Sequence, residues 1–257
     1  MKGERRLVLV RHGQTEYNAT GRMQGQLDTE LSERGRQQVR QASEVLKDWD
    51  VSAVISSDLV RARETAEILA SGWGTPVTTD PRLRETDLGR WQGASHAEID
   101  RDYPGQRAYW RHDPQWAPPG GESRVQVAER AFSLVNDVMH SEAFGDGGLV
   151  VMVAHGGTIG ALTARLLGLP LSHVQIFSGL GNVHWSQLLA RPQLTSAPGQ
   201  TSPPAIDGST VPLVPSADPE WFSSPAWHLE GWNISASMTE LAHGSVGTSN
   251  PDEGESQ

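Results

Sequence analysis

The sequence predicts a three-layer α/β/α sandwich with a mostly parallel central sheet. Short runs of valine, leucine and isoleucine alternate along the chain with segments of helical periodicity, and this alternation is typical of a parallel sheet covered by helices. Residues 149–154, Leu-Val-Val-Met-Val-Ala, give the strongest strand signal, because an unbroken apolar run indicates a strand buried on both faces. The chain has 257 residues, enough to bury a sizeable core.

The first half of the chain supplies three strands and two helices. The strands are expected at residues 7–10, 53–55 and 77–79. One helix lies between the first two strands, and its apolar residues are Val39, Ala42, Leu46 and Trp49. The other covers residues 59–70. Asp58 stands directly before it and is the expected N-cap, which would place Arg61 in the first turn.

The second half continues the same alternation. A long helix is expected over 123–140, and Gly156-Gly157 begins a helix that continues over 158–167 after the strand at 149–154. Two further strands are expected, at 183–189 and at 227–233, the second docking back on the body of the protein. Residues 103–121 contain several prolines and show little periodicity, so we expect an ordered excursion over one end of the sheet.

Composition changes after residue 190. Residues 192–219 contain seven prolines among serine, threonine and alanine, and such a segment buries too little apolar area to offset its chain entropy. We therefore expect a main domain over 1–190, a flexible insertion over 191–220, a docking segment over 221–242 and a disordered acidic tail over 243–257. One arginine is set against eight acidic residues from residue 191 on, so the main domain can still hold a positively charged pocket.

Composition also excludes several functions. The chain has no cysteine, which excludes disulfides, cysteine-nucleophile phosphatases and cysteine-based zinc or iron–sulfur sites, and which fits a reducing compartment. The net charge of −10 argues against a nucleic-acid partner. No apolar segment is long enough for a signal peptide or a membrane span, so we expect a cytoplasmic protein without a membrane partner.

Charged residues follow three of the predicted strands, at the edge where ligands bind in open parallel sheets. Arg11 and His12 end the first strand, Arg61 follows the second, and His155 follows the strand at 149–154. Two arginines, two histidines and two helix N-termini at one edge favour a phosphate dianion as the ligand.

The histidines indicate how that phosphate reacts. A neutral imidazole can attack phosphorus, and we expect His12 to be this nucleophile, with its other nitrogen donating to a backbone carbonyl near Gly13. His155 is expected to stabilise charge on the phosphate oxygens, so that no metal is needed. The leaving alkoxide needs a proton, for which Glu85 is the candidate and Asp87 the alternative; their spacing does not separate them.

Four groups of residues resemble the successive motifs of the histidine phosphatase superfamily, the phosphoglycerate-mutase-like enzymes. They are Arg11-His12-Gly13-Gln14-Thr15 with Asn18, Ser56-Ser57-Asp58-Leu59 with Arg61, Leu83-Arg84-Glu85 with Gly89, and Ala154-His155-Gly156-Gly157. The resemblance implies a phosphoglycerate mutase-like fold, a phosphorylated His12, a phosphate pocket of Arg11, Arg61 and His155, a further phosphate contact from Asn18, Glu85 as proton donor, no cofactor, and a homodimer.

Other residues narrow the resemblance. Residues 85–93 are similar to the phosphatase pattern rather than to that of cofactor-dependent mutases, and residues 22–32, 110–118, 120–125 and 181–188 resemble the actinobacterial glucosyl-3-phosphoglycerate phosphatases. This implies hydrolysis of glucosyl-3-phosphoglycerate to glucosylglycerate. The alternatives are a phosphoglycerate mutase, a broad-specificity sugar-phosphate phosphatase and a non-catalytic phospho-ligand-binding protein.

Substrate contacts are expected from the segment that follows His12, at Thr15, Asn18, Gln24 and Gly25. Gln24 either contacts substrate hydroxyls or orders its own loop. Trp110 and Trp116 either stack on a sugar or pack the excursion onto the body.

Overall fold

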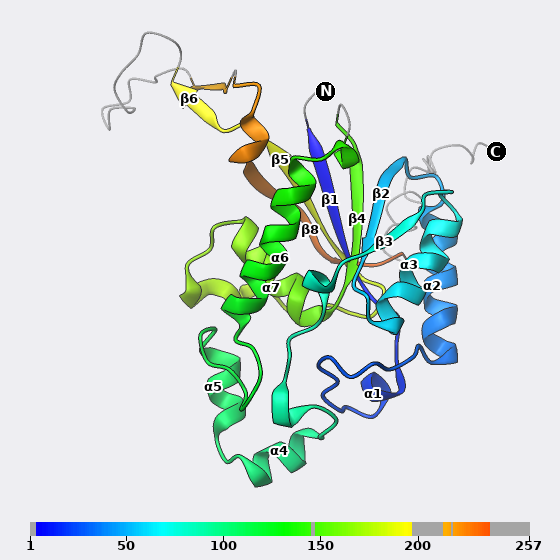
Figure 1. Ribbon diagram of the computed structural model, residues 1–257, viewed down its shortest axis with the longest axis vertical. Helices are drawn as coiled ribbons and strands as arrows, with labels where there is room; N and C mark the ends of the chain where they lie inside the picture. The colour runs from blue at the N-terminus through cyan, green and yellow to red at the C-terminus, as the bar shows by residue number, and fades with distance from the viewer. Residues whose placement is uncertain (1–3, 145–146, 197–212, 217, 237–257) are drawn as a thin grey trace, which may run out of the picture.

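The computed structural model describes residues 4–144, 147–196, 213–216 and 218–236. Its centre is a six-stranded sheet in the order β3-β2-β4-β1-β5-β8 (Figure 1). The strands are β1 (Arg5–Arg11), β2 (Val51–Ser56), β3 (Val77–Thr79), β4 (Leu149–Ala154), β5 (Trp185–Arg191) and β8 (Ala226–Ile234). The first four run parallel to one another, whereas β5 pairs antiparallel with both β1 and β8.

Helices cover both faces of this sheet, and the predicted three-layer sandwich is confirmed (Figure 1). One face carries α2 (Glu33–Leu46) and α3 (Val60–Ser71), and the other carries α6 (Arg124–Met139) and α7 (Gly156–Leu166). Because strand side chains alternate between faces, Leu7 and Leu9 pack in the α6–α7 core and Val8 and Val10 in the α2–α3 core.

The remaining elements are short. The helices are α1 (Glu16–Ala19), α4 (His96–Asp102) and α5 (Gln106–His112), and the 3₁₀ helices are η1 (Pro81–Leu83), η2 (Gly89–Trp91), η3 (Glu142–Phe144), η4 (Leu171–Ile176) and η5 (Trp221–Ser223). Strand β6 (Leu194–Ser196) pairs with β7 (Leu213–Pro215). No helix in the described part of the chain is both long and apolar enough to cross a bilayer.

The register of the central strands brings distant residues to one edge. Arg11 is the partner of Ala154 on β4, and the next amide, His12 N, donates to Ala154 O over 3.0 Å. On the other side of β4, Ser57 N donates to Val153 O over 2.9 Å. Residues 11, 12, 57 and 155 therefore meet where β1, β2 and β4 end.

The excursion over 103–121 is more regular than expected, because it contains α5 and follows α4, neither of which the sequence predicts. The segment packs on Trp91, whose ring centroid lies 5.5 Å from that of Trp116 and 6.1 Å from that of Trp110. Each helix has seven residues, too few for a clear apolar repeat. These contacts support a packing role for both tryptophans.

The N-cap expected at Asp58 is wrong. Leu59 is the N-cap of α3, and the Asp58 carboxylate instead accepts from Arg84 Nε over 2.8 Å. Asp28, from a remote loop, accepts from the free amide at the start of α3, Val60 N, over 2.8 Å. The first turn of α3 still carries Arg61, as predicted.

The strand predicted over 227–233 is confirmed as β8, which adds to the sheet beside β5. The β6–β7 ribbon lies within the segment predicted to be a flexible insertion. Residues 197–212, 217 and the predicted tail over 243–257 lie outside the described residues.

Candidate active site

His12 and His155 lie side by side at the carboxyl edge of the sheet. Their ring centroids are 5.1 Å apart, with the ring planes inclined at 58°. His12 follows β1, and His155 follows β4 as the N-cap of α7. Adjacent parallel strands therefore bring together two imidazoles that are far apart in the sequence.

His12 is held in one neutral form. Its Nδ1 donates to Gly13 O over 2.7 Å, as the sequence predicts, because a carbonyl oxygen can only accept. Its Nε2 accepts from Arg61 Nε over 3.3 Å. Burial lowers the pKa of His12 well below its usual value, and the charges of Arg61 and Arg11 lower it further. The Nε2 lone pair is therefore unprotonated at neutral pH.

Arg61 is fully buried beneath the site, on the first turn of α3. Besides His12, its guanidinium donates to Leu27 O and Gly25 O, each over 2.8 Å. Burial lowers the pKa of Arg61 to about 10, so the group stays cationic at neutral pH. These three bonds occupy only part of its five N–H groups.

His155 is also buried, and its Nε2 lies 2.9 Å from the hydroxyl of Ser57. That hydroxyl accepts from Leu59 N over 3.3 Å. His155 Nδ1 is buried without a hydrogen-bond partner among the described residues. Burial lowers the pKa of His155 well below its usual value, with Arg61 the next cause. Sequence reasoning missed the role of Ser57, although it placed this residue within a motif.

Arg11 is the second cation at this edge. Its Nη1 donates to Leu180 O over 2.5 Å, and its Nε is buried without a partner among the described residues. Burial lowers its pKa, and Glu85 opposes this shift. Arg11 lies directly beside Gly156, where a Cβ atom would be 3.5 Å from Arg11 Nε.

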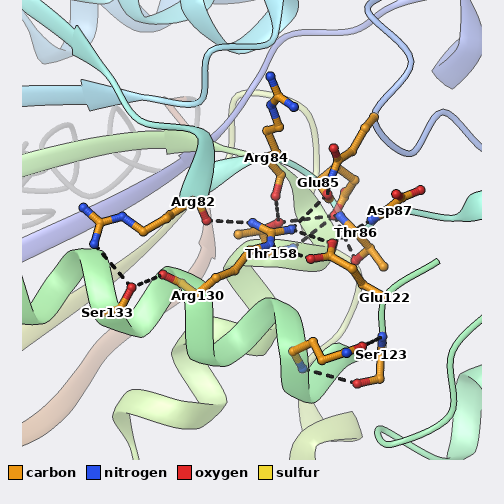
Figure 2. Close-up of polar contacts among 12 residues, drawn as sticks. Arg82, Arg84, Glu85, Thr86, Asp87, Glu122, Ser123, Arg130, Ser133 and Thr158 are labelled. Carbon is orange, nitrogen blue, oxygen red and sulfur yellow. Dashed lines mark hydrogen bonds and ion pairs between the residues drawn. The ribbon is translucent and has the colours of Figure 1, made fainter.

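Glu85 occupies the N-terminus of α7. Its carboxylate accepts from Gly157 N over 3.1 Å and from Thr158 N over 3.2 Å (Figure 2). From the sequence we expect the N-terminus of this helix to face the phosphate directly. The Glu85 carboxylate instead binds its free amides, because a helix N-terminus attracts negative charge. Asp87, the alternative acid, instead caps a turn by accepting from Gly89 N over 2.8 Å.

Two residues that the sequence did not indicate hold the backbone around Glu85 (Figure 2). Arg130, on α6, donates to Arg82 O over 2.6 Å and to Glu85 O over 3.0 Å. It also pairs with both oxygens of Glu122, each over 3.0 Å. Glu122 in turn accepts from Asp87 N over 2.9 Å. Nothing local distinguishes Arg130 from other polar residues of a helix, so only the folded structure identifies it.

The four residues expected to contact substrate form one ordered segment after His12. Thr15 and Asn18 make a capping box at α1, and Asn18 Oδ1 also accepts from Asn182 over 3.2 Å. Gln24 Oε1 accepts from Thr15 over 2.9 Å and from Thr29 over 2.6 Å. Gly25 contributes its carbonyl to Arg61. The contacts of Gln24 favour its loop-ordering role. Asn182 also donates to His12 O, so this one side chain links Asn18 to the backbone of His12.

A cavity of about 380 Å³ opens beside Arg11 and Glu85 and extends along α6 and α7 toward η4. Apolar side chains form much of its wall, among them Trp110, Val125, Leu171, Val174, Phe177, Leu180 and Trp232. Arg124, Glu129 and Arg165 add charge to the wall. The cavity can receive the organic part of an ester whose phosphate lies at Arg11. The described residues contain no group of three acidic or histidine side chains that could hold a metal ion.

Comparisons with known proteins agree with this geometry. The model of the histidine phosphatase superfamily (branch 1) matches residues 7–196. The glucosyl-3-phosphoglycerate phosphatase of Mycolicibacterium vanbaalenii is 48% identical, over 91% of this chain and 96% of its own. That of Mycobacterium tuberculosis is 47% identical, over 91% of this chain and 97% of its own. A solved structure of mycobacterial glucosyl-3-phosphoglycerate phosphatase with VO3 has a TM-score of 0.73 at 46% identity, covering 90% of this chain and 100% of that one.

Proposed function

Because this chain belongs to the histidine phosphatase superfamily, we propose that it hydrolyses phosphate monoesters through a phosphohistidine at His12, with glucosyl-3-phosphoglycerate as its substrate. The observation that carries this proposal is the pair of neutral imidazoles 5.1 Å apart, close to the buried Arg61 and the half-buried Arg11. That arrangement combines a nucleophile with a site for a dianion.

In the first step, His12 Nε2 attacks phosphorus and the phosphorus–oxygen ester bond breaks. Arg11 and Arg61 offset the charge on the phosphate oxygens through their free N–H groups. If the Ser57 hydroxyl donates its hydrogen to His155 Nε2, the ring proton lies on Nδ1, the atom without a protein partner. His155 then donates from Nδ1 to a phosphate oxygen.

Glu85 supplies the proton for the leaving alkoxide. Its carboxyl group lines the cavity beside Arg11, where the phosphate binds in this proposal. After the alcohol leaves, the Glu85 carboxylate takes a proton from water, which attacks the phosphohistidine. The phosphorus–nitrogen bond breaks, and inorganic phosphate and neutral His12 are formed.

The substrate assignment rests on the relatives and on the cavity. Two relatives at 48% and 47% identity carry the name glucosyl-3-phosphoglycerate phosphatase. The cavity beside Arg11 and Glu85 offers aromatic faces, suited to a sugar ring, and cationic groups, suited to a glycerate.

The decisive experiment measures inorganic phosphate released from glucosyl-3-phosphoglycerate and from a panel of other phosphate esters. We expect the wild type to release phosphate fastest from glucosyl-3-phosphoglycerate and His12→Ala to release none. Rapid quenching should trap phosphate on His12 in the wild type. Interconversion of 2- and 3-phosphoglycerate without phosphate release would instead identify a mutase, and equal rates with all esters would remove the substrate assignment.

A cytoplasmic location and a homodimer stay predictions of the sequence. Fractionation of the native host and light scattering of the purified protein test them. A membrane-bound or exclusively monomeric protein would contradict them.

A further inference from the structure

The cavity beside the reaction centre holds two cations that lack an acidic partner. Five charged residues line it: Arg11, Glu85, Arg124, Glu129 and Arg165. Glu129 and Arg165 neutralise one another, with Arg165 Nε 2.7 Å from the carboxylate. Within the described part of the chain, neither Arg11 nor Arg124 forms an ion pair, and the Glu85 carboxylate is held by the N-terminus of α7.

Arg124 is poorly satisfied by the protein. It is the first residue of α6, and its side chain is half-buried with the guanidinium carbon 5.1 Å from the centroid of the Trp110 ring. Its hydrogen bond is a long one, from Nη1 to Arg111 O over 3.3 Å. Burial lowers the pKa of Arg124, and the charge of Glu85, another residue of the cavity wall, opposes this shift. Of the five N–H groups of this guanidinium, only one forms a hydrogen bond to a described residue.

The two cations have different neighbours. Arg11 lies against Gly156, next to the pair of histidines, and therefore serves the reacting phosphate. Arg124 lies on the α6 side of the cavity with Val125 and Ala128, and its guanidinium lies over the Trp110 ring. A dianionic phosphate at Arg11 leaves Arg124 without an ion-pair partner among the described residues.

We propose that Arg124 binds a second anionic group of the substrate, a carboxylate, and thereby selects phosphate esters of hydroxy acids over esters of neutral alcohols. The inference rests on the proposed phosphatase function and adds a specificity-determining residue to it. The planar guanidinium, packed against the face of Trp110, presents its N–H groups as a fork that matches a carboxylate. In a 3-phosphoglycerate unit the carboxylate and the phosphate stand at opposite ends of one short carbon chain, and Arg11 and Arg124 both line the cavity that would receive it.

The test compares two esters that differ at one carbon. In 3-phosphoglycerate this carbon is a carboxylate, and in glycerol 3-phosphate it is a neutral hydroxymethyl group. We expect Arg124→Ala to lower kcat/KM for 3-phosphoglycerate by about 10- to 100-fold, mainly through KM, the range for losing a charged hydrogen-bonding partner. Hydrolysis of glycerol 3-phosphate should stay within about twofold of wild type, because that ester makes no ionic contact there. Arg124→Lys keeps the charge but loses the forked pair of donors, so its kcat/KM for 3-phosphoglycerate should lie between those of the wild type and Arg124→Ala.

Arg111→Ala is the matched control, because Arg111 is exposed, adjoins the same cavity wall and is absent from its lining. Arg111→Ala should leave kcat/KM unchanged for both esters. Equal losses on both esters with Arg124→Ala, or no loss on either, would overturn the proposal.

A binding measurement separates this inference from the proposed function. Calorimetry on the non-hydrolysing His12→Ala variant compares its affinities for the two esters with and without Arg124→Ala. A preference for 3-phosphoglycerate that disappears with Arg124 supports the inference even if phosphate release fails. Equal affinity for both esters, before and after the change, refutes it while leaving hydrolysis intact.

Discussion

Arg61 donates from Nε to Nε2 of His12 over 3.3 Å, while the rest of its guanidinium holds the carbonyls of Gly25 and Leu27. One buried cation thus contacts the nitrogen that we propose as the nucleophile and anchors the loop over 24–27. The same charge helps to keep His12 unprotonated. The proposed reactivity of His12 and the local structure therefore involve the same side chain.

Arg61→Ala and Arg61→Lys should both be severely impaired. We expect kcat to fall by about 10²- to 10³-fold in each, because neither side chain supplies a rigid fork of donors to the phosphate. Arg61→Ala should also lower the free energy of unfolding by about 3 kcal/mol, since it leaves a cavity and unpaired carbonyls. Steady-state kinetics and denaturant unfolding measure the two effects. Arg63→Ala, exposed on the same helix, is the control, and near-wild-type activity in Arg61→Lys would contradict the account.

Stability should depend on pH through His12 and His155. Their pKa values in the folded protein lie well below the usual 6.5, so the unfolded chain binds protons that the folded protein excludes. The resulting stabilisation is present above pH 6.5 and is lost as pH falls toward the folded pKa values. Each histidine should contribute about 1.4 kcal/mol per pH unit in that range.

Urea unfolding between pH 7 and pH 5 checks this dependence. His155→Asn should remove the contribution of one histidine to the slope of unfolding free energy against pH. Combining it with His12→Asn should remove the contributions of both histidines. His173→Asn, on exposed η4, should keep the wild-type slope. An unchanged slope in the double variant would show that other groups cause the pH dependence.

The sequence predicts the strand-end residues well because their positions follow from the sheet. Strands β1 and β4 are buried on both faces and therefore read as unbroken apolar runs, and the residues after such runs must meet at one edge. Arg11, His12 and His155 could be placed in this way. The tautomer of His12 also follows, since Gly13 lies next to it in the chain.

Contacts between distant polar residues could not be predicted in this way. Asp58 precedes a helix and has the chemistry of an N-cap, but its ion pair with Arg84 depends on where the loop over 80–89 returns. Arg130 lies on a helix with many polar residues, and its role appears only when α6 packs beneath Glu85. Sequence periodicity reports which face is buried, not which carbonyl a buried guanidinium will meet.

Glu85 and Asp87 should differ sharply in their effect on alkyl and aryl esters. An alkoxide needs a proton to leave, whereas a nitrophenolate does not, so Glu85→Gln should lower kcat for alkyl esters by about 10²- to 10⁴-fold and for p-nitrophenyl phosphate far less. Asp87→Asn keeps an oxygen for Gly89 N and should resemble the wild type. Phosphate release from both esters measures this. Equal losses on the two esters in Glu85→Gln would remove its role as proton donor.

Arg130 should act on catalysis through Glu85, because it holds the Glu85 and Arg82 carbonyls but does not line the cavity (Figure 2). Arg130→Gln, combined with Glu122→Gln to avoid an unpaired carboxylate, should lower kcat for alkyl esters by about tenfold with little change in KM. The loss of kcat for p-nitrophenyl phosphate should be much smaller, as we expect for Glu85→Gln. Arg82→Gln removes a neighbouring cation that pairs with Asp80 and Asp137. It is the control, and it should leave the ratio of kcat for alkyl esters to kcat for the aryl ester unchanged. A loss of stability without a shift in the alkyl-to-aryl ratio would mean that Arg130 supports only the fold, since a misplaced proton donor must penalise the poorer leaving group more.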